Sequence, residues 1–138
     1  MRFSKHLVSA LVLLGSPALA DESRPGLSVE LNAQSETDAG CLLTFMVGNG
    51  HPQDIESAVF ETVLFNKSGQ VDRLTLFDFG GLPAGRPRVR QFQVDGLACD
   101  DLGQVLINGA STCKVGGADS ALCGTLELGT RTGTEMIG

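Results

Sequence analysis

Short apolar stretches, separated by polar and Gly-rich turns, follow one another along this chain and predict β-strands. Within residues 27–33 every second side chain is apolar, as in a strand with one buried face. The residues on that face are Leu27, Val29, Leu31 and Ala33. Apolar runs bounded by turn residues predict six more strands. They cover residues 41–47, 55–66, 71–79, 88–94, 102–108 and 122–131.

The strands predicted at 55–66 and 71–79 are the centre of the expected fold. A short loop containing Gly69 separates them, and such a loop between two apolar runs is typical of a β-hairpin. No stretch of the mature chain has a convincing helical period. Seven short strands with Gly-rich turns favour a single all-β domain, an immunoglobulin-like antiparallel β-sandwich. A small β-barrel is the competing fold, and residues 109–121 are expected to be a loop.

The first twenty residues have the pattern of a secretory signal peptide. Arg2 and Lys5 precede an apolar segment at 7–14, and small residues precede the expected cleavage site after Ala20. The apolar segment is too short to span a hydrocarbon layer of about 30 Å. We therefore expect residues 21–138 to form one domain, exported to the bacterial periplasm or the extracellular side, with no membrane span after cleavage.

Charge narrows the range of partners. The chain has ten basic and sixteen acidic residues. Two of the basic residues, Arg2 and Lys5, lie in the signal peptide, so the mature chain carries a net charge of −8. This charge, without a basic tract, argues against nucleic acid and anionic membranes as partners.

Cysteine usage predicts two structural disulfides. An even number of cysteines in a small exported chain is typical of a disulfide framework, and no C-x-x-C motif is present. In immunoglobulin order the second and fifth strands are antiparallel neighbours. Cys41 opens the second strand and Cys99 follows the fifth, which predicts a Cys41–Cys99 bridge. Cys113 and Cys123 would close the last loop.

The central part of the chain, residues 43–108, resembles the small immunoglobulin-like domains of the FxLYD type found in exported bacterial proteins. The matching segments are VGNG at 47–50, VFETVLF at 59–65 followed by SGQ at 68–70, LPAG at 82–85 and FQV at 92–94. The resemblance covers about half of the mature chain. It implies a fold and no particular activity.

Residues that could support catalysis or metal binding are few. The only mature histidine is His51, which lies in a turn without a nucleophile motif nearby. Asp100 and Asp101 are adjacent, and adjacent side chains usually point apart. Met46 and Met136 have no copper-binding spacing, and core packing is the expected role of Met46. We therefore expect no enzymatic activity, no cofactor and no metal site.

The hairpin has more apolar side chains than one core can use. One set of its residues fits the sandwich core, and the other set must be covered, because monomers seldom expose large apolar patches. The loop at 80–87 or the C-terminal tail could cover this second set. A protein partner or a second copy of the chain is the alternative. The side chains predicted for such a contact are Val63, Phe65, Phe77 and Phe79.

Three arginines form a second candidate surface. Arg86, Arg88 and Arg90 lie two residues apart, so on a strand they would share one face about 7 Å from neighbour to neighbour. The row would contact an anion or an acidic partner, or only solubilise the surface. The same parity continues into Phe92 and Val94, so we expect either a bulge near position 91 or a loop for the arginines.

Together these observations predict a non-enzymatic binding or accessory protein that acts through protein–protein contacts. The alternative is a structural or stress-protective envelope protein without a specific ligand. A metal-binding protein or a hydrolase is less favoured, because histidine is scarce and Trp and Tyr are absent.

Overall fold

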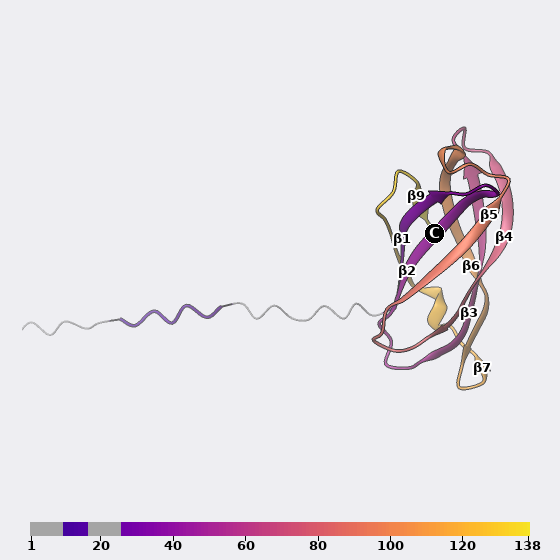
Figure 1. Ribbon diagram of the computed structural model, residues 1–138. Helices are drawn as coiled ribbons and strands as arrows, with labels where there is room; N and C mark the ends of the chain where they lie inside the picture. The colour runs from indigo at the N-terminus through magenta and orange to yellow at the C-terminus, as the bar shows by residue number, and fades with distance from the viewer. Residues whose placement is uncertain (1–9, 17–25) are drawn as a thin grey trace, which may run out of the picture.

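The computed structural model describes residues 10–16 and 26–138 of the chain (Figure 1). Most of the predicted signal peptide lies outside the described residues. Residues 10–16 are exposed and contain neither helix nor strand. Within the described ranges, no helix is long and apolar enough to cross a membrane.

Residues 26–138 form nine strands and two single-turn 3₁₀ helices. The first five strands are β1 (Leu27–Glu36), β2 (Gly40–Asn49), β3 (Ile55–Asn66), β4 (Val71–Leu82) and β5 (Arg88–Asp95). The remaining elements are η1 (Cys99–Asp101), β6 (Leu102–Val115), β7 (Ala118–Asp119), η2 (Leu122–Gly124), β8 (Leu126–Thr130) and β9 (Glu135–Ile137). The first five predicted strands agree with β1–β5, apart from their ends.

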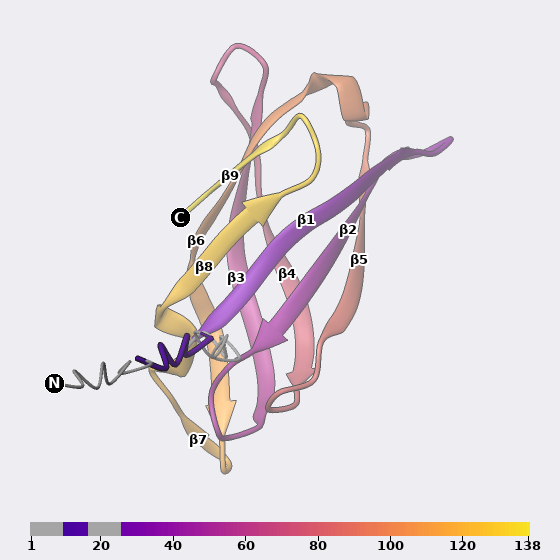
Figure 2. The same ribbon diagram turned by 90° about the vertical axis from the view of Figure 1, so that its left-hand side faces the viewer.

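The strands form two sheets that pack face to face around one core. One sheet has the order β5-β2-β1-β8, and the other has the order β4-β3-β6-β7 with β9 added beside β6. Figure 2 shows the four-stranded sheet in front and the five-stranded sheet behind it. The fold is therefore an all-β sandwich. As the sequence predicts, the second and fifth strands are antiparallel neighbours.

The C-terminal part of the chain differs from the prediction of a purely antiparallel sandwich. The predicted strand at 122–131 divides into η2 and the shorter β8, and β8 pairs with β1 in parallel. After a turn the chain crosses to the other sheet, where β9 pairs with β6, again in parallel. Met136 of β9 is only 9% exposed, and burial of this side chain favours the crossing.

β6 is longer than the sequence pattern indicates. Residues 109–115, expected to lie in a loop, continue the strand and pair with β3 through register shifts. A two-residue turn then reverses the chain into β7. Gly116 and Gly117 of this turn have φ values of 58° and 75°, the backbone that favours glycine in a tight hairpin. Small side chains at 109–112 resemble a loop in composition, but backbone pairing with β3 overrides that tendency.

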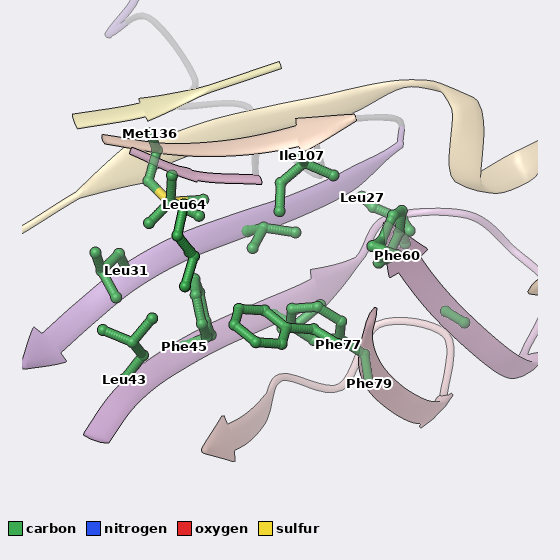
Figure 3. Packing of buried hydrophobic residues seen from close by; sticks show 14 of the residues in the cluster. Leu27, Leu31, Leu43, Phe45, Phe60, Leu64, Phe77, Phe79, Ile107 and Met136 are labelled. Atoms are coloured by element: carbon green, nitrogen blue, oxygen red, sulfur yellow. The ribbon is translucent and has the colours of Figure 1, made fainter. Parts of the chain in front are cut away.

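Phenylalanine rings from both sheets fill the centre of the core (Figure 3). Phe45 of β2 is fully buried and packs against Phe77 and Phe79 of β4, with ring centroids 5.9 and 5.6 Å away. Phe92 of β5 stacks on Phe77 at 4.2 Å with nearly parallel planes. Such pairs stabilise a core beyond the area that they bury. The aromatic cluster therefore joins the two sheets.

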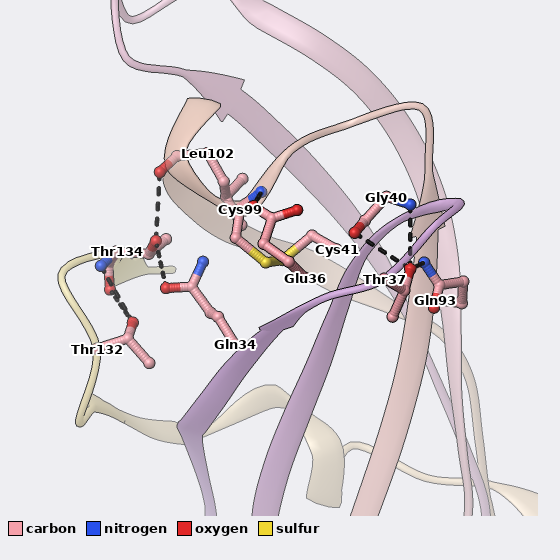
Figure 4. The surroundings of a disulfide bond; sticks show 10 residues. All are labelled: Gln34, Glu36, Thr37, Gly40, Cys41, Gln93, Cys99, Leu102, Thr132 and Thr134. Carbon is pink, nitrogen blue, oxygen red and sulfur yellow. Dashed lines mark hydrogen bonds between the residues drawn. A yellow bond between two sulfur atoms is a disulfide. The ribbon is translucent and has the colours of Figure 1, made fainter.

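Both predicted disulfides are present. Cys41 at the start of β2 is bonded to Cys99 of η1, at a sequence separation of 58 and with Cα atoms 4.9 Å apart. Cys113 of β6 is bonded to Cys123 of η2, across ten residues. Figure 4 shows the first bridge beside Glu36, whose Oε1 accepts a hydrogen bond of 2.6 Å from the Cys99 amide. The first bridge thus holds the 95–102 connection to the four-stranded sheet.

Candidate functional site

A bulge near the turn of the β3–β4 hairpin decides which side chains of residues 71–79 face outward. Phe65 pairs with Val71, but Leu64 pairs with Arg73, so Asp72 has no partner on β3. Because side chains alternate between faces, one extra residue exchanges the faces of all that follows. Val71 therefore faces outward with Phe65. Beyond the bulge, Leu74 faces outward and Phe77 faces the core.

The outer face of the five-stranded sheet consequently carries a continuous row of apolar side chains. Leu74 lies opposite Val63, Val63 lies opposite Leu106, and Leu106 lies opposite Ile137. The row crosses β4, β3, β6 and β9 in register. Val71, Phe65 and Leu76 extend it to either side. We call these seven residues the apolar face: Phe65, Val63, Val71, Leu74, Leu76, Leu106 and Ile137.

Part of the apolar face is open to solvent. Val71, Leu74 and Leu76 are 59%, 61% and 59% exposed. Val63 lies in the middle of the row and is only 6% exposed, because its neighbours on β4 and β6 cover it. The apolar face is therefore buried at Val63 and exposed along β4, the strand at the right of Figure 1. We call the three exposed residues of β4, Val71, Leu74 and Leu76, the ridge.

The predicted contact residues are corrected at two positions. Val63 and Phe65 lie on the outer face, as expected. Phe77 and Phe79 do not, because the bulge turns them inward, where they are 4% and 0% exposed. The pattern analysis assigned these two to the surface and missed the exposed leucines at 74 and 76.

Neither segment proposed as a cover lies over the ridge. Ile137 of the C-terminal tail joins the row as a further strand position, and Met136 turns into the core. The loop at 83–87 is tied to the β2–β3 connection, where the Ala84 amide donates to Asp54 Oδ1 and the Gly85 amide to the Asn49 carbonyl. The ridge remains exposed in the single chain.

The three arginines do not form one row. β5 pairs with β2 from Arg88 to Asp95 without a register shift, so neither the expected bulge nor a loop is present at Arg88 and Arg90. Both have the same parity as the inward-facing Phe92, on the edge strand of the four-stranded sheet. Arg86 precedes the strand and is exposed.

Arg90 spans the seam between the two sheets. Its Nε donates to the Phe79 carbonyl at 2.6 Å and its Nη2 to the Gly81 carbonyl at 2.9 Å, both on β4. Arg73 of β4 donates in the opposite direction, from Nη1 to the Asp95 carbonyl at 2.7 Å. This bonding explains how arginine occupies an inward position. The charged group reaches main-chain oxygen atoms at the sheet edge, and its methylene groups cover the core.

Replacement of Arg90 by methionine is expected to lower the free energy of unfolding by about 1–2 kcal/mol, because two charge-assisted hydrogen bonds are lost at a half-buried site. Lysine at this position should recover little, since it cannot reach two carbonyls in a fork. Arg86→Met is the matched control. Urea titration followed by circular dichroism measures the effect, and equal losses for the two methionine variants would show that the seam bonds contribute nothing.

Other residues with possible chemistry are dispersed. His51 Nε2 lies 2.9 Å from the Leu122 carbonyl and joins the β2–β3 turn to η2. Asp100 and Asp101 form part of η1. Met46, expected in the core, is 40% exposed on the outer face of the four-stranded sheet, opposite Val89. Among the described residues, no group of three or more His, Cys, Asp or Glu side chains could hold a metal ion.

A shallow hollow on that face is lined by Ser28, Glu30, Met46 and Gly129, among others. A hydrogen bond from Asn32 and, to a smaller extent, the neighbouring Arg131 hold the pKa of Glu30 below its usual value. The carboxylate therefore stays ionised at neutral pH. Its two partners come from the chain itself, which makes a structural role sufficient for this residue.

Comparison with protein-family models, with curated proteins and with solved structures finds no significant match.

Proposed function

We propose that this protein is an exported, non-enzymatic binding or accessory module of immunoglobulin-like type, which contacts another protein through the apolar face. One observation carries the proposal. Val71, Leu74 and Leu76 are each more than half exposed, and Leu74 lies directly opposite the buried Val63. Contiguous apolar surface of this kind typically marks an interaction site on a soluble protein.

The proposed function places the protein in the periplasm, after export. Two disulfides in one small domain are typical of oxidising compartments. The N-terminal sequence pattern supports the same location. A protein exported in this way would meet other exported or envelope proteins.

The shape of the apolar face favours a protein partner over a small molecule. Small-molecule sites are concave and enclose most of their ligand. The apolar face is instead the outer surface of a sheet, with side chains standing on neighbouring strands. Protein interfaces combine such an apolar centre with a polar surround.

Site-specific photo-cross-linking in the exporting cell tests this proposal. A benzophenone amino acid at position 74 or 76 is expected to give a discrete cross-linked species. The same group at position 89 serves as the control, because Val89 is 54% exposed on the outer face of the other sheet. Equal cross-linking at all three positions, or none at 74 and 76, would overturn the proposed contact surface. The protein would then fit the alternative of a structural envelope protein better.

A further inference from the structure

Carboxylates surround the apolar row on the same face of the sheet. Glu61 lies opposite Leu76, one step along β3 from Val63, and Asp78 lies opposite Val59 in the next step. On the other side of the row, Glu135 of β9 lies opposite Gln104, which in turn lies opposite Phe65. Successive steps on one face of a strand are about 7 Å apart. Acidic groups thus flank the row on both sides.

These carboxylates are positioned by neutral donors and keep their charge uncompensated. Asn108 Nδ2 donates to Glu61 Oε1 at 2.8 Å, and Gln104 Nε2 donates to Glu135 Oε2 at 2.9 Å. The Gly80 amide donates to Asp78 Oδ1 at 2.8 Å. Within residues 26–138 none of the three acids forms an ion pair. A partner can therefore supply the missing positive charges.

The basic residues of the described chain lie away from the apolar row, with Arg86 just before β5 and Arg88 at its first position. Arg73 and Arg90 close the seam between the sheets, and Arg131 pairs with Glu30 on the other sheet. Lys114 pairs with Asp119 near the β6–β7 turn, and Lys67 is at the tip of the β3–β4 hairpin. A second copy packed face to face would bring two sets of carboxylates together, and like charges across an interface are unfavourable.

We infer that the apolar face binds a polypeptide segment of another protein whose apolar side chains are flanked by lysine or arginine. This inference rests on the proposed function and adds the chemistry of the partner to it. Apolar side chains of the segment lie along Leu74, Val63 and Leu106. Its cations meet Glu61 and Asp78 on one side and Glu135 on the other. Complementary charge of this kind sets orientation and excludes wrong partners more than it raises affinity.

Three synthetic peptides test the inference with the intact mature protein. The first alternates leucine and threonine and has two lysines at each end (KKLTLTLKK), the second has glutamates at the ends (EELTLTLEE), and the third replaces leucine by serine (KKSTSTSKK). Fluorescence anisotropy of labelled peptides is expected to show saturable binding of the first only. Its dissociation constant should rise about tenfold when the salt concentration increases from 50 mM to 500 mM, because exposed charges are screened.

Two variants locate the binding on the molecule. The triple variant Glu61→Gln, Asp78→Asn, Glu135→Gln is expected to weaken binding about tenfold at low salt, as three exposed charge pairs allow. At 500 mM salt the triple variant should bind the first peptide about as tightly as the parent protein does. The double variant Leu74→Ser, Leu76→Ser should weaken binding at both salt concentrations. Glu127→Gln, on the opposite sheet, is the control for an unspecific loss of negative charge.

The outcomes separate this inference from the proposed function. Equal binding of the lysine and glutamate peptides, with cross-linking at positions 74 and 76 retained, would overturn the charge assignment and leave the contact surface in place. A cross-link at position 76 between two copies, with a dimer in sedimentation velocity, would show that a second copy occupies the face and would overturn the inference. Loss of both peptide binding and cross-linking would overturn the two together.

Discussion

Phe77→Asp is expected to prevent folding, whereas Leu76→Asp is expected to leave the fold intact. The two residues are adjacent in β4 but face opposite ways, with exposures of 4% and 59%. Loss of the Phe77 ring removes its stacking on Phe92 and about 3–5 kcal/mol of packing. An unpaired carboxylate in the core costs several kcal/mol more. Total stability of small domains is usually about 5–15 kcal/mol.

Circular dichroism and thermal melting of the two purified variants measure this difference. For Leu76→Asp we expect a native strand spectrum and a loss of about 1 kcal/mol, because aspartate is a poor strand former even where it is exposed. If Phe77→Asp folds and Leu76→Asp does not, then Phe77 faces solvent and Leu76 faces the core. The apolar face would then be wrongly assigned.

Replacement of both Cys41 and Cys99 by alanine is expected to lower the free energy of unfolding by about 4 kcal/mol. This bridge joins positions 58 residues apart, and the loop-entropy model gives the largest stabilisation for the longest loop. At the size of this domain, the change corresponds to a fall in melting temperature of roughly 15 °C.

The second bridge provides the matched control. Cys113 and Cys123 are only ten residues apart, so their double alanine variant should lose somewhat under 3 kcal/mol, or about 10 °C. Melting curves of the two double variants and the oxidised parent protein compare the effects. A larger loss from the short bridge would mean that local packing around η2, and not chain entropy, determines what the disulfides contribute.

The sequence pattern was sufficient to predict much of the sandwich. Period-two alternation identified β1, and apolar runs bounded by turn residues identified β2 to β5. The positions of Cys41 and Cys99 at neighbouring strand ends were sufficient for the disulfide pairing. The parallel strands β8 and β9 were not predictable in the same way. They are five and three residues long, too short to show a period, and the chain changes sheet between them.

The residues of the apolar face were predicted only in part, and the cause is local. Counting every second residue along 71–79 groups Val71 with Phe77 and Phe79. The bulge at Asp72 breaks this parity, which places Val71 outside and the two phenylalanines inside. A bulge in a strand moves the side chains that follow it to the opposite face of the sheet. Nothing in the residue types at 71–74 indicates the bulge, so the structure was needed to assign the faces.

The arginines illustrate a second limit of pattern analysis. Parity placed Arg88 and Arg90 on the core side with Phe92, and their charge argued against that side. In the structure Arg90 keeps its inward parity, and its charged group is hydrogen-bonded to main-chain carbonyls of β4 at the seam between β4 and β5. Such acceptors belong to a strand distant in sequence order, and no local pattern reveals them.

The hydrogen bonds of Arg90 also affect strand pairing at the β4 edge of the five-stranded sheet. An open sheet edge accepts almost any extended chain, because main-chain hydrogen bonds are the same for every sequence. At the β4 edge, Arg90 already occupies the carbonyls of Phe79 and Gly81 that an added strand would use. An added strand therefore cannot form its main-chain hydrogen bonds at these two positions while Arg90 is bound there. Arg90→Met would free both carbonyls for pairing with another strand.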